Sequence, residues 1–361
     1  MSKPKLERQD AVRPFIAAYL VDRPDERVSD RDLAMLDRIN YAFGLVVDGR
    51  VSGDHWTSVD QLAELKRKKP ELLTILSLGG WGAGGFSDAC FTAEGRERFA
   101  QSAVELMLKY DFDGIDLDWE YPTIDSANID ARPEDKFTFT KMMRLLRAKF
   151  DALSLVTGRY YRLSMAIGCG HPRYAQIMEM EELGTFLDEI NLMSYDMRHG
   201  TRYMTGHHAN LYPNPADESD ASGHMAVELI HGCGVPLEKI VLGAAFYGRG
   251  WTGVKPTAAG DGANGLHAPS SKFEVPGGDY KDMVREKIGL NGFTRYWDDT
   301  AKAAWLFDGS TFFSYEDPEA LRAKGNYVRE RGLGGLMYWE YNGDNEGELL
   351  TAVREAIDDK A

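Results

Sequence analysis

Short apolar runs recur along the chain, and most are separated by longer segments in which apolar residues follow helical spacing. The runs are continuous rather than alternating, which is typical of strands buried on both faces of a parallel sheet. The predicted strands are Phe15–Val21, Ile39–Val47, Leu72–Leu78, Gly114–Trp119, Arg162–Gly168, Glu189–Tyr195, Lys239–Phe246 and Leu333–Trp339. The predicted helices are Asp30–Asp37, Asp60–Lys68, Ala93–Lys109, Pro133–Phe150, Gly223–Cys233, Pro318–Arg331 and Glu346–Ile357.

Strands that alternate with helices predict a parallel α/β architecture, and eight strands close a (β/α)8 barrel, or TIM barrel. Such a barrel takes typically about 250 residues, whereas this chain has 361. The excess lies between the seventh strand and the helix at Pro318, in a stretch too long for an ordinary loop. We therefore predict a barrel over residues 12–250 and 316–361, and a small α+β insertion domain over residues 251–315 that forms one wall of a cleft.

The charge of the chain limits its partners. It carries 42 Lys and Arg against 57 Asp and Glu, a formal net charge of −15. No local Lys/Arg cluster offsets this charge, so a phosphate backbone would be repelled, and we expect no nucleic-acid partner. No apolar run reaches the roughly 18 residues that a membrane-spanning helix needs. We expect no membrane partner either, and we expect a monomer.

The N-terminal sequence MSKPKLERQDAVRP is polar and basic, without the apolar stretch of a signal peptide. We expect a cytoplasmic protein as encoded, or a secreted one if an export segment has been removed.

The three cysteines, Cys90, Cys169 and Cys233, are far apart and odd in number. This pattern indicates neither a disulfide framework nor a CxxC metal or redox site. The eight histidines form no HExxH pattern. We expect buried, inert thiols, and neither a metal nor another cofactor.

The stretch DFDGIDLDWEYP, residues 111–122, carries the most informative chemistry. As a strand, it places Asp116, Asp118 and Glu120 on one face, about 6.6–6.8 Å apart, and apolar residues on the other. The apolar face would contact the surrounding helices, so the carboxylates would point into the barrel. Asp113 lies at the start of the strand. Glu120 comes last, at the carboxyl-terminal end, where barrel enzymes place their chemistry.

Three carboxyl groups this close in a packed interior cannot all ionise freely, so their titrations are coupled and spread apart. One group kept protonated beside one kept ionised is the arrangement of a general acid with an electrostatic stabiliser. The residues alone leave two other interpretations open. One is a solvated acidic face on an edge strand, and the other is a site for Mg²⁺ or Ca²⁺, which carboxylate clusters bind.

At these residues the sequence resembles glycoside hydrolase family 18, the chitinases and their relatives. DGIDLDWE fits the DxxDxDxE signature of that family, with Asp113, Asp116, Asp118 and Glu120 in its four places. Further motifs follow in the family's order: INYAF at 39–43, SLGG at 77–80, MSYD at 193–196, FYGR at 246–249 and MYWE at 337–340. The segment after FYGR is similar to the insertion domain of the branch with deep, tunnel-like clefts.

The resemblance implies substrate-assisted hydrolysis with retention of the anomeric configuration. Glu120 would protonate the glycosidic oxygen, while the 2-acetamido oxygen of the sugar would attack the anomeric carbon and form an oxazolinium ion. Asp118 would bind the acetamido N–H, and Asp116 would share a proton with Asp118. Tyr195 would donate its hydroxyl to the acetamido carbonyl oxygen.

The resemblance also implies a set of sugar-binding residues. Trp339 would be the platform under the sugar at the cleavage point, and Met193 would contact the acetyl methyl. Asp196 would bind sugar hydroxyls or tune Glu120. The further candidates are Trp81 and Tyr121 on the leaving-group side, then Tyr19, Phe43, Tyr247 and Arg249.

Four residues, Asp113, Ser77, Gly79 and Gly80, are expected to support the site. Ser77 would hydrogen-bond Asp113 or Asp116. Gly79 and Gly80 would allow a tight turn or bulge against the acidic strand.

The expected activity is that of a retaining endo-chitinase, which cuts β-1,4 linkages between N-acetylglucosamine units of chitin or chitooligosaccharides. One alternative is a hydrolase of another N-acetylglucosamine glycan, such as the N-glycan core or peptidoglycan, although the insertion favours linear chitin. The other is a non-catalytic lectin of the same fold. Such lectins lose the acid, whereas Glu120 is present here with Asp116 and Asp118.

Overall fold

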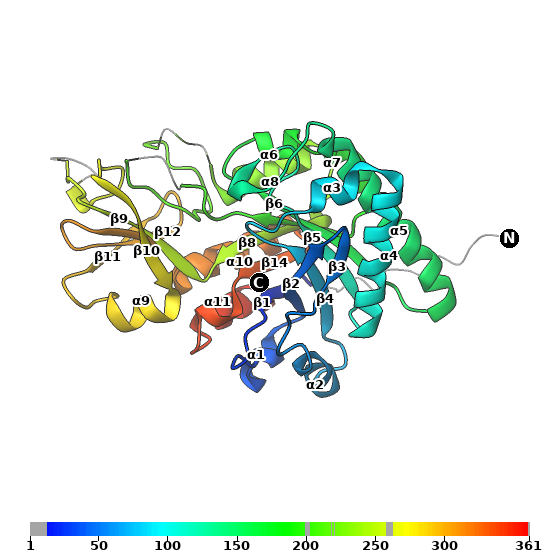
Figure 1. Ribbon diagram of the computed structural model, residues 1–361. Helices are drawn as coiled ribbons and strands as arrows, with labels where there is room; N and C mark the ends of the chain where they lie inside the picture. Colours follow the sequence, from blue (N-terminus) through cyan, green and yellow to red (C-terminus); the bar gives the residue numbers. More distant parts are fainter. Residues whose placement is uncertain (1–12, 199–202, 218, 220, 258–262, 360–361) are drawn as a thin grey trace.

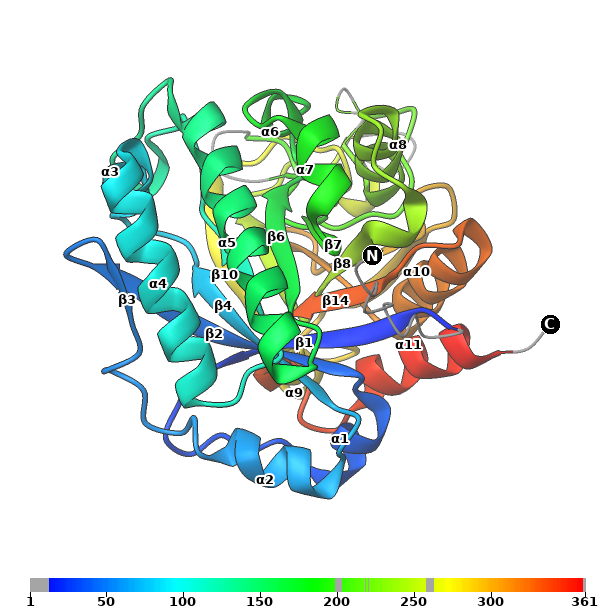
Figure 2. The ribbon, with the colours of Figure 1, turned by 90° about the vertical axis from the view of Figure 1, so that its right-hand side faces the viewer.

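The computed structural model describes residues 13–198, 203–217, 219, 221–257 and 263–359. Eight parallel strands form a ring in the order β1–β14–β8–β7–β6–β5–β4–β2, and β2 pairs back with β1 (Figures 1 and 2). The strands are β1 (Phe15–Val21), β2 (Arg38–Val47), β4 (Leu73–Gly79), β5 (Gly114–Asp118), β6 (Arg162–Gly168), β7 (Glu189–Met193), β8 (Ile240–Ala245) and β14 (Gly335–Trp339). A short strand β3 (Arg50–Ser52) pairs antiparallel with the end of β2. The predicted TIM barrel is confirmed.

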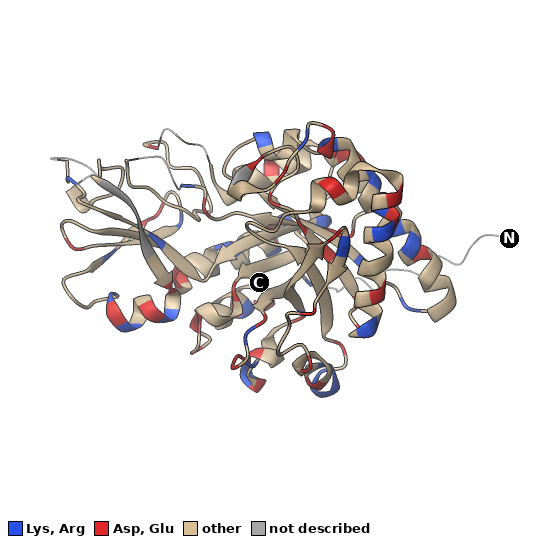
Figure 3. Cartoon of the chain, in the orientation of Figure 1, with Lys and Arg blue, Asp and Glu red and all other residues tan. Residues whose placement is uncertain are grey.

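Helices surround the ring (Figure 2). They are α1 (Asp30–Met35), α2 (Gln61–Lys68), α3 (Phe86–Phe91), α4 (Ala93–Lys109), α5 (Asp135–Thr157), α6 (Arg173–Gln176), α7 (Met180–Phe186), α8 (Gly223–Gly232), α10 (Pro318–Arg331) and α11 (Glu348–Asp358). The 3₁₀ turns η1 (Ser126–Asn128), η2 (Leu237–Lys239) and η4 (Tyr341–Gly343) lie in connections. Charged residues of both signs lie mostly on the helices and loops (Figure 3). Among the described residues, no helix is long and apolar enough to cross a membrane.

Local sequence signals explain why α4 and α10 match their predicted bounds. The Thr92 side chain accepts a hydrogen bond from the backbone N–H of Gly95 and so caps the start of α4. Asp317 caps α10 in the same way, with Pro318 at the first helical position. Gly332 ends α10 in the left-handed conformation, with φ 68°.

The outer face of β5 is anchored by aromatic packing. Trp119, directly after β5, is buried and stacks on Phe86 of α3 with ring centroids 5.5 Å apart. Its ring also meets the edge of Phe139 on α5 at 6.0 Å. Because Trp119 is held against the helices, the alternate side chains of the strand face the barrel interior.

The lobe after β8 contains a five-stranded antiparallel sheet in the order β10–β9–β13–β12–β11, which stands beside the barrel in Figure 1. Its elements are β9 (Tyr247–Thr252), β10 (Lys272–Asp279), α9 (Tyr280–Glu286), β11 (Thr294–Asp298), β12 (Ala303–Phe307) and β13 (Phe312–Tyr315). The lobe has its own hydrophobic cluster, which includes Trp251, Trp305 and Phe312.

The predicted lobe boundary at residue 251 falls inside β9. The barrel wall ends at Phe246, whose backbone N–H donates to the carbonyl of Trp339 at 2.8 Å. The chain then enters the second sheet at once, because β9 pairs with both β10 and β13. Tyr247 and Arg249 therefore belong to the lobe sheet.

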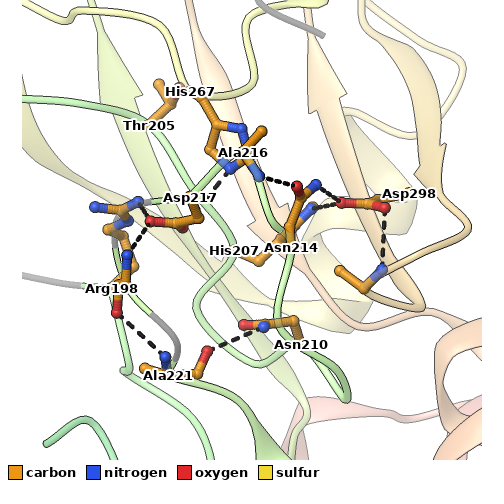
Figure 4. A network of polar contacts seen from close by, with 12 residues as sticks. Arg198, Thr205, His207, Asn210, Asn214, Ala216, Asp217, Ala221, His267 and Asp298 are labelled. Carbon is orange, nitrogen blue, oxygen red and sulfur yellow. Dashed lines mark hydrogen bonds and ion pairs between the residues drawn. The ribbon is translucent and has the colours of Figure 1, made fainter.

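The connection between β7 and α8 packs on the lobe through a polar network (Figure 4). The side chain of Asp298 in the lobe accepts a hydrogen bond from Asn214 at 2.6 Å and lies 3.2 Å from His207. Asp217 of the connection pairs with Arg198 and lies 3.6 Å from His267 of the lobe. The segment that follows β7 is thus held between barrel and lobe, an arrangement that the sequence did not predict.

Candidate active site

The acidic strand carries its carboxyl groups into the barrel. Asp116 and Asp118 are 0% and 4% exposed, and Glu120 follows two residues beyond the end of β5. Asp116 lies in register with Ser77 of β4 on one side and Ser164 of β6 on the other. Three carboxyl groups therefore line one path from the middle of the barrel to its carboxyl-terminal rim.

Asp116 is the deepest of the three and is satisfied by four donors from four other strands. These are Tyr19 (2.9 Å), Ser77 (2.9 Å), Ser164 (2.7 Å) and Asn191 (3.0 Å). Burial raises the pKa of Asp116, while the hydrogen bonds act in the opposite direction. The donors hold the carboxyl group in one orientation.

Asp118 contrasts with Asp116, because its Oδ1 atom is buried without a hydrogen-bond partner. Burial raises the pKa of Asp118 well above its ordinary value, and the charges of Glu120 and Asp116 raise it further. In the described structure, no hydrogen bond is seen between Asp116 and Asp118, and the oxygens of Asp116 accept from four donors. The proton sharing implied by the resemblance stays a prediction.

Glu120 lies at the rim, in a pocket of about 60 Å³. Burial is the main cause that raises the pKa of Glu120 to about 7, and the charge of Asp196 adds to it. A carboxyl group of this kind is half protonated at neutral pH and can act as a general acid. The pocket is lined by Glu120, Tyr121, Gly168, Cys169, Gly170, Tyr174, Met193, Tyr195 and Asp196.

The end of β7 supplies Met193, Tyr195 and Asp196 to this pocket. The Tyr195 hydroxyl makes a weak contact of 4.0 Å with the sulfur of Met337. Arg249 clamps Asp196 with two bonds of 2.6 and 2.7 Å, and His208 lies 3.6 Å away. Burial alone would raise the pKa of Asp196, but His208 and Arg249 together hold it below its ordinary value.

Gly79 and Gly80 allow β4 to touch the acidic strand. Their φ angles are +121° and +88°, and a Cβ at Gly79 would lie 2.0 Å from the backbone oxygen of Asp118. A Cβ at Gly80 would lie 2.5 Å from the ring of Phe43. The N–H of Gly80 donates to the carbonyl of Asp118 at 2.9 Å. The predicted close turn against the acidic strand is present.

Aromatic rings lie at or just beyond the carboxyl-terminal ends of several barrel strands. Trp339, at the end of β14, stacks on Phe43 at 5.5 Å and tilts against Tyr19 at 5.8 Å. Trp81 is 68% exposed at the rim, where a ligand could cover its face. Tyr121 packs on Tyr174 with centroids 4.6 Å apart.

The structure corrects the placement of Tyr19, one of the expected sugar-binding residues. Tyr19 is 2% exposed and donates to Asp116, so it supports a carboxyl group rather than facing a ligand. Phe43 stacks on Trp339, and Tyr247 packs against the rings of Tyr195 and His208, with centroids 6.0 and 5.3 Å apart. Both Phe43 and Tyr247 are half-buried, and their roles in sugar binding stay predictions.

Asp113 does not join the other acids, which corrects its expected supporting role. It accepts a hydrogen bond from the backbone N–H of Thr74 at 2.9 Å and pairs with Lys66 at 3.0 Å and Arg159 at 2.8 Å. A strand rises about 3.3 Å per residue, so Asp113 lies at the opposite end of β5 from Glu120. Ser77 therefore bonds Asp116 and not Asp113.

Sequence reasoning missed Ser164, Asn191, His208 and Tyr174. Asn191 carried a signal, because it shares a strand face with Met193 and Tyr195 at every second residue. His208 lies in a connection and Tyr174 in the four-residue helix α6, where the sequence has no periodicity that shows which side chains face the site. Cys169, expected to be an inert thiol, is partly buried and lines the pocket, and burial raises its pKa.

Among the described residues, no group of three or more His, Cys, Asp or Glu side chains could hold a metal ion. Of the three acids of this strand, Asp116 is instead bound by hydroxyl and amide donors. The metal interpretation of the acidic strand therefore has no support in this geometry.

Comparison with known proteins agrees with this geometry. Residues 15–344 match the family model of glycosyl hydrolases family 18. The chain belongs to this family. It is 39% identical over 330 residues to chitinase A1 of Niallia circulans, covering 84% of this chain and 46% of that protein. It is 32% identical over 358 residues to endochitinase 1 of Metarhizium robertsii, covering 88% of this chain and 78% of that protein.

A solved structure is also similar over nearly its whole length. It is a family 18 N-acetylglucosaminidase from Paenibacillus barengoltzii, with 42% sequence identity and a TM-score of 0.91. The match covers 95% of this chain and 99% of that chain. The chain spans less than half the length of chitinase A1.

The raised pKa of Glu120 predicts a pH-dependent cost to folding. The folded-state pKa of about 7 lies above the ordinary 4.5, so the folded protein holds a proton that the unfolded chain releases between these pH values. Stability is therefore lost as pH rises from 4.5 to 7. Glu120→Gln removes this loss, and the variant gains roughly 3 kcal/mol over the wild type across the range.

Urea unfolding of both proteins at a series of pH values measures the difference. Glu330→Gln, at an exposed position on α10, is the control. It keeps Glu120, so we expect its stability to fall with rising pH as that of the wild type does. A stability difference between Glu120→Gln and wild type that stays constant from acid to neutral pH contradicts the assignment.

Proposed function

We propose that this chain is a retaining chitinase that hydrolyses β-1,4 linkages between N-acetylglucosamine units by substrate-assisted catalysis. The observation that carries the proposal is the pairing of two unlike carboxyl groups. Asp118 presents a buried oxygen without a partner, and Glu120 beside it has its pKa raised to about 7. The names of the relatives, chitinase and endochitinase, support the same substrate.

Glu120 is the proposed general acid. Its raised pKa leaves about half of the molecules protonated at neutral pH, and it lies at the rim where a glycosidic oxygen can approach. Asp118 Oδ1 accepts the acetamido N–H in this proposal, which satisfies the buried atom and favours the positive charge that forms on the oxazolinium ring. The acetamido oxygen supplies the nucleophile at high effective concentration.

Asp116 is held in place by its four donors, and its charge is one cause that raises the pKa of Asp118. Asp116 therefore favours a protonated Asp118 in the protein without substrate. When positive charge develops on the substrate, the ionised form of Asp118 becomes the better partner, and in this proposal its proton passes to Asp116.

The pocket walls support the remaining assignments. The Tyr195 hydroxyl, which makes only a weak contact with Met337 in the described structure, orients the acetamido carbonyl. Met193 lines the same pocket and contacts the acetyl methyl. Trp339 and the exposed Trp81 offer ring faces to the sugars on the floor and at the mouth.

Glu120→Gln tests the acid directly. The amide keeps the shape but has no proton to give, so kcat on chitooligosaccharides falls by about 10²- to 10⁴-fold while the Kd for chitotetraose stays within about twofold. In the wild type, kcat/KM falls as pH rises through about 7, because only the protonated acid is active. Stopped assays across pH and calorimetric binding to the inactive variant measure both effects.

Glu330→Gln, at an exposed position on α10, serves as the control and retains wild-type kcat. Near-full activity of Glu120→Gln contradicts the assignment of the acid. Binding of chitotetraose by the wild type without any hydrolysis favours the lectin alternative.

A second candidate is exo-acting removal of single N-acetylglucosamine units. The similarity to the Paenibacillus barengoltzii N-acetylglucosaminidase, across 99% of that chain, favours it. Digestion of chitohexaose separates the two by its earliest products. Endo cleavage gives dimers to tetramers from the start, whereas exo cleavage gives equal amounts of monomer and pentamer.

A further inference from the structure

The two strands that flank the substrate side of the barrel, β7 and β8, pair over a short distance. Their backbones are in register only at Ile190 with Ile240 and Asn191 with Val241. On its other side, β8 pairs with β14 as far as Ala245 with Trp339. The end of β7 that leads to Tyr195 and Asp196 therefore has no continuous backbone ladder to β8.

Ser194 takes the place of the missing ladder. Its hydroxyl donates to the carbonyl of Gly243 at 2.8 Å and accepts from the N–H of Gly243 at 2.9 Å. Gly243 is required for this approach, because a Cβ there would lie 2.2 Å from the carbonyl oxygen of Leu192. One side chain thus joins the two strands immediately before Tyr195.

A buried ion pair between α10 and the segment before it also binds the backbone of β8. The ammonium of Lys324 on α10 donates to the same carbonyl of Gly243 at 2.8 Å and lies 2.8 Å from Glu316. Glu316 accepts from the backbone N–H of Ala245 at 2.6 Å. The side chains of Lys324 and Glu316 are 1% and 3% exposed. This buried ion pair therefore binds two backbone groups of β8, the carbonyl of Gly243 and the N–H of Ala245.

The ion pair lies close to the pocket. The charge of Lys324 acts on Cys169, which lines the pocket, and on His208, which borders Asp196. Neither Lys324 nor Glu316 lines the pocket itself. Apart from this effect of charge, which Ser194→Ala leaves in place, the bridge acts on the reaction through the position of β7 and β8.

We propose that Ser194, Lys324 and Glu316, together the β7–β8 bridge, are positioning residues that set the place of Tyr195 and Asp196 opposite Glu120. The inference rests on the proposed function, because it assigns the bridge to the same reaction. A buried ion pair is weak evidence for stability, since apolar replacements of similar size are often neutral or stabilising. We infer that the ion pair serves instead to fix the backbone of β8, to which Ser194 attaches the end of β7.

The test removes both charges at once with Lys324→Met/Glu316→Gln, so that no unpaired charge is left buried. We expect kcat on chitooligosaccharides to fall about tenfold, equivalent to ~1.4 kcal/mol, with KM within about twofold of wild type. Ser194→Ala, which alters no charge, should lower kcat in the same direction with KM unchanged.

The chain offers a matched control at the opposite end of the barrel. Arg147 donates to the carbonyl of Tyr161 at 3.0 Å and pairs with Asp188, which accepts from the N–H of Leu163 at 2.8 Å. Arg147→Met/Asp188→Asn therefore removes a buried ion pair of the same design, far from the pocket. We expect kcat and KM within about twofold of wild type.

Equal losses of kcat in the two double variants would overturn the proposal, because the effect would then be general destabilisation. Wild-type kcat in the bridge variants, or a raised KM with unchanged kcat, would also overturn it. Hydrogen exchange of the peptide covering residues 190–198 adds a readout that needs no activity. We expect exchange about tenfold faster in the bridge variants and unchanged in the control.

The exchange readout separates the two proposals. If the wild type does not hydrolyse chitooligosaccharides, the proposed function fails, and the exchange rates alone decide whether the bridge sets the end of β7. An unchanged exchange rate in the bridge variants counts against the bridge, whatever the activity.

Discussion

Three carboxyl groups enter a closed ring of strands, and the energetic cost of burying them determines how the surrounding barrel is built. In the described part of the chain, neither Asp116 nor Asp118 takes part in an ion pair. Their charge must therefore be balanced by hydrogen bonds, by protonation or by a ligand. The three carboxyl groups are stabilised in different ways, and they therefore differ in protonation state.

Asp116 is balanced by four fixed donors, and Asp118 by protonation until a ligand arrives. Glu120, at the rim, has a pKa near neutrality. Asp196 differs from these groups, because the Arg249 guanidinium lowers its pKa and keeps it ionised. Its negative charge in turn helps to raise the pKa of Glu120. The site thus keeps neighbouring acids in different protonation states, as general acid catalysis requires.

Much of the fold could be predicted from the sequence, because buried parallel strands appear as continuous apolar runs. The bounds of β1 and β6 match the prediction to the residue, and those of β5 and β7 extend less far than expected. The chain leaves the ladder at Trp119 and Ser194, where side-chain contacts take over from backbone pairing. Periodicity reports which face a residue occupies but not where a ladder ends.

The core of the site was predictable for a related reason. Asp116, Asp118 and Glu120 follow the strand period, so their common face could be deduced. Asp113 matches the same motif but faces Lys66 and Arg159 at the other end of the strand. His208, Tyr174 and Lys324 reach the site region from connections or an outer helix, and only tertiary packing determines their contacts.

In the proposed reaction, the substrate's own acetamido oxygen completes this set of carboxyl groups. Proton NMR of chitohexaose digestion, recorded faster than the products mutarotate, tests this role of the acetamido group. We expect the new reducing ends to appear first as the β-anomer, since attack from within the sugar followed by water retains the configuration. Initial formation of the α-anomer would contradict it, because inversion requires water to attack the anomeric carbon directly.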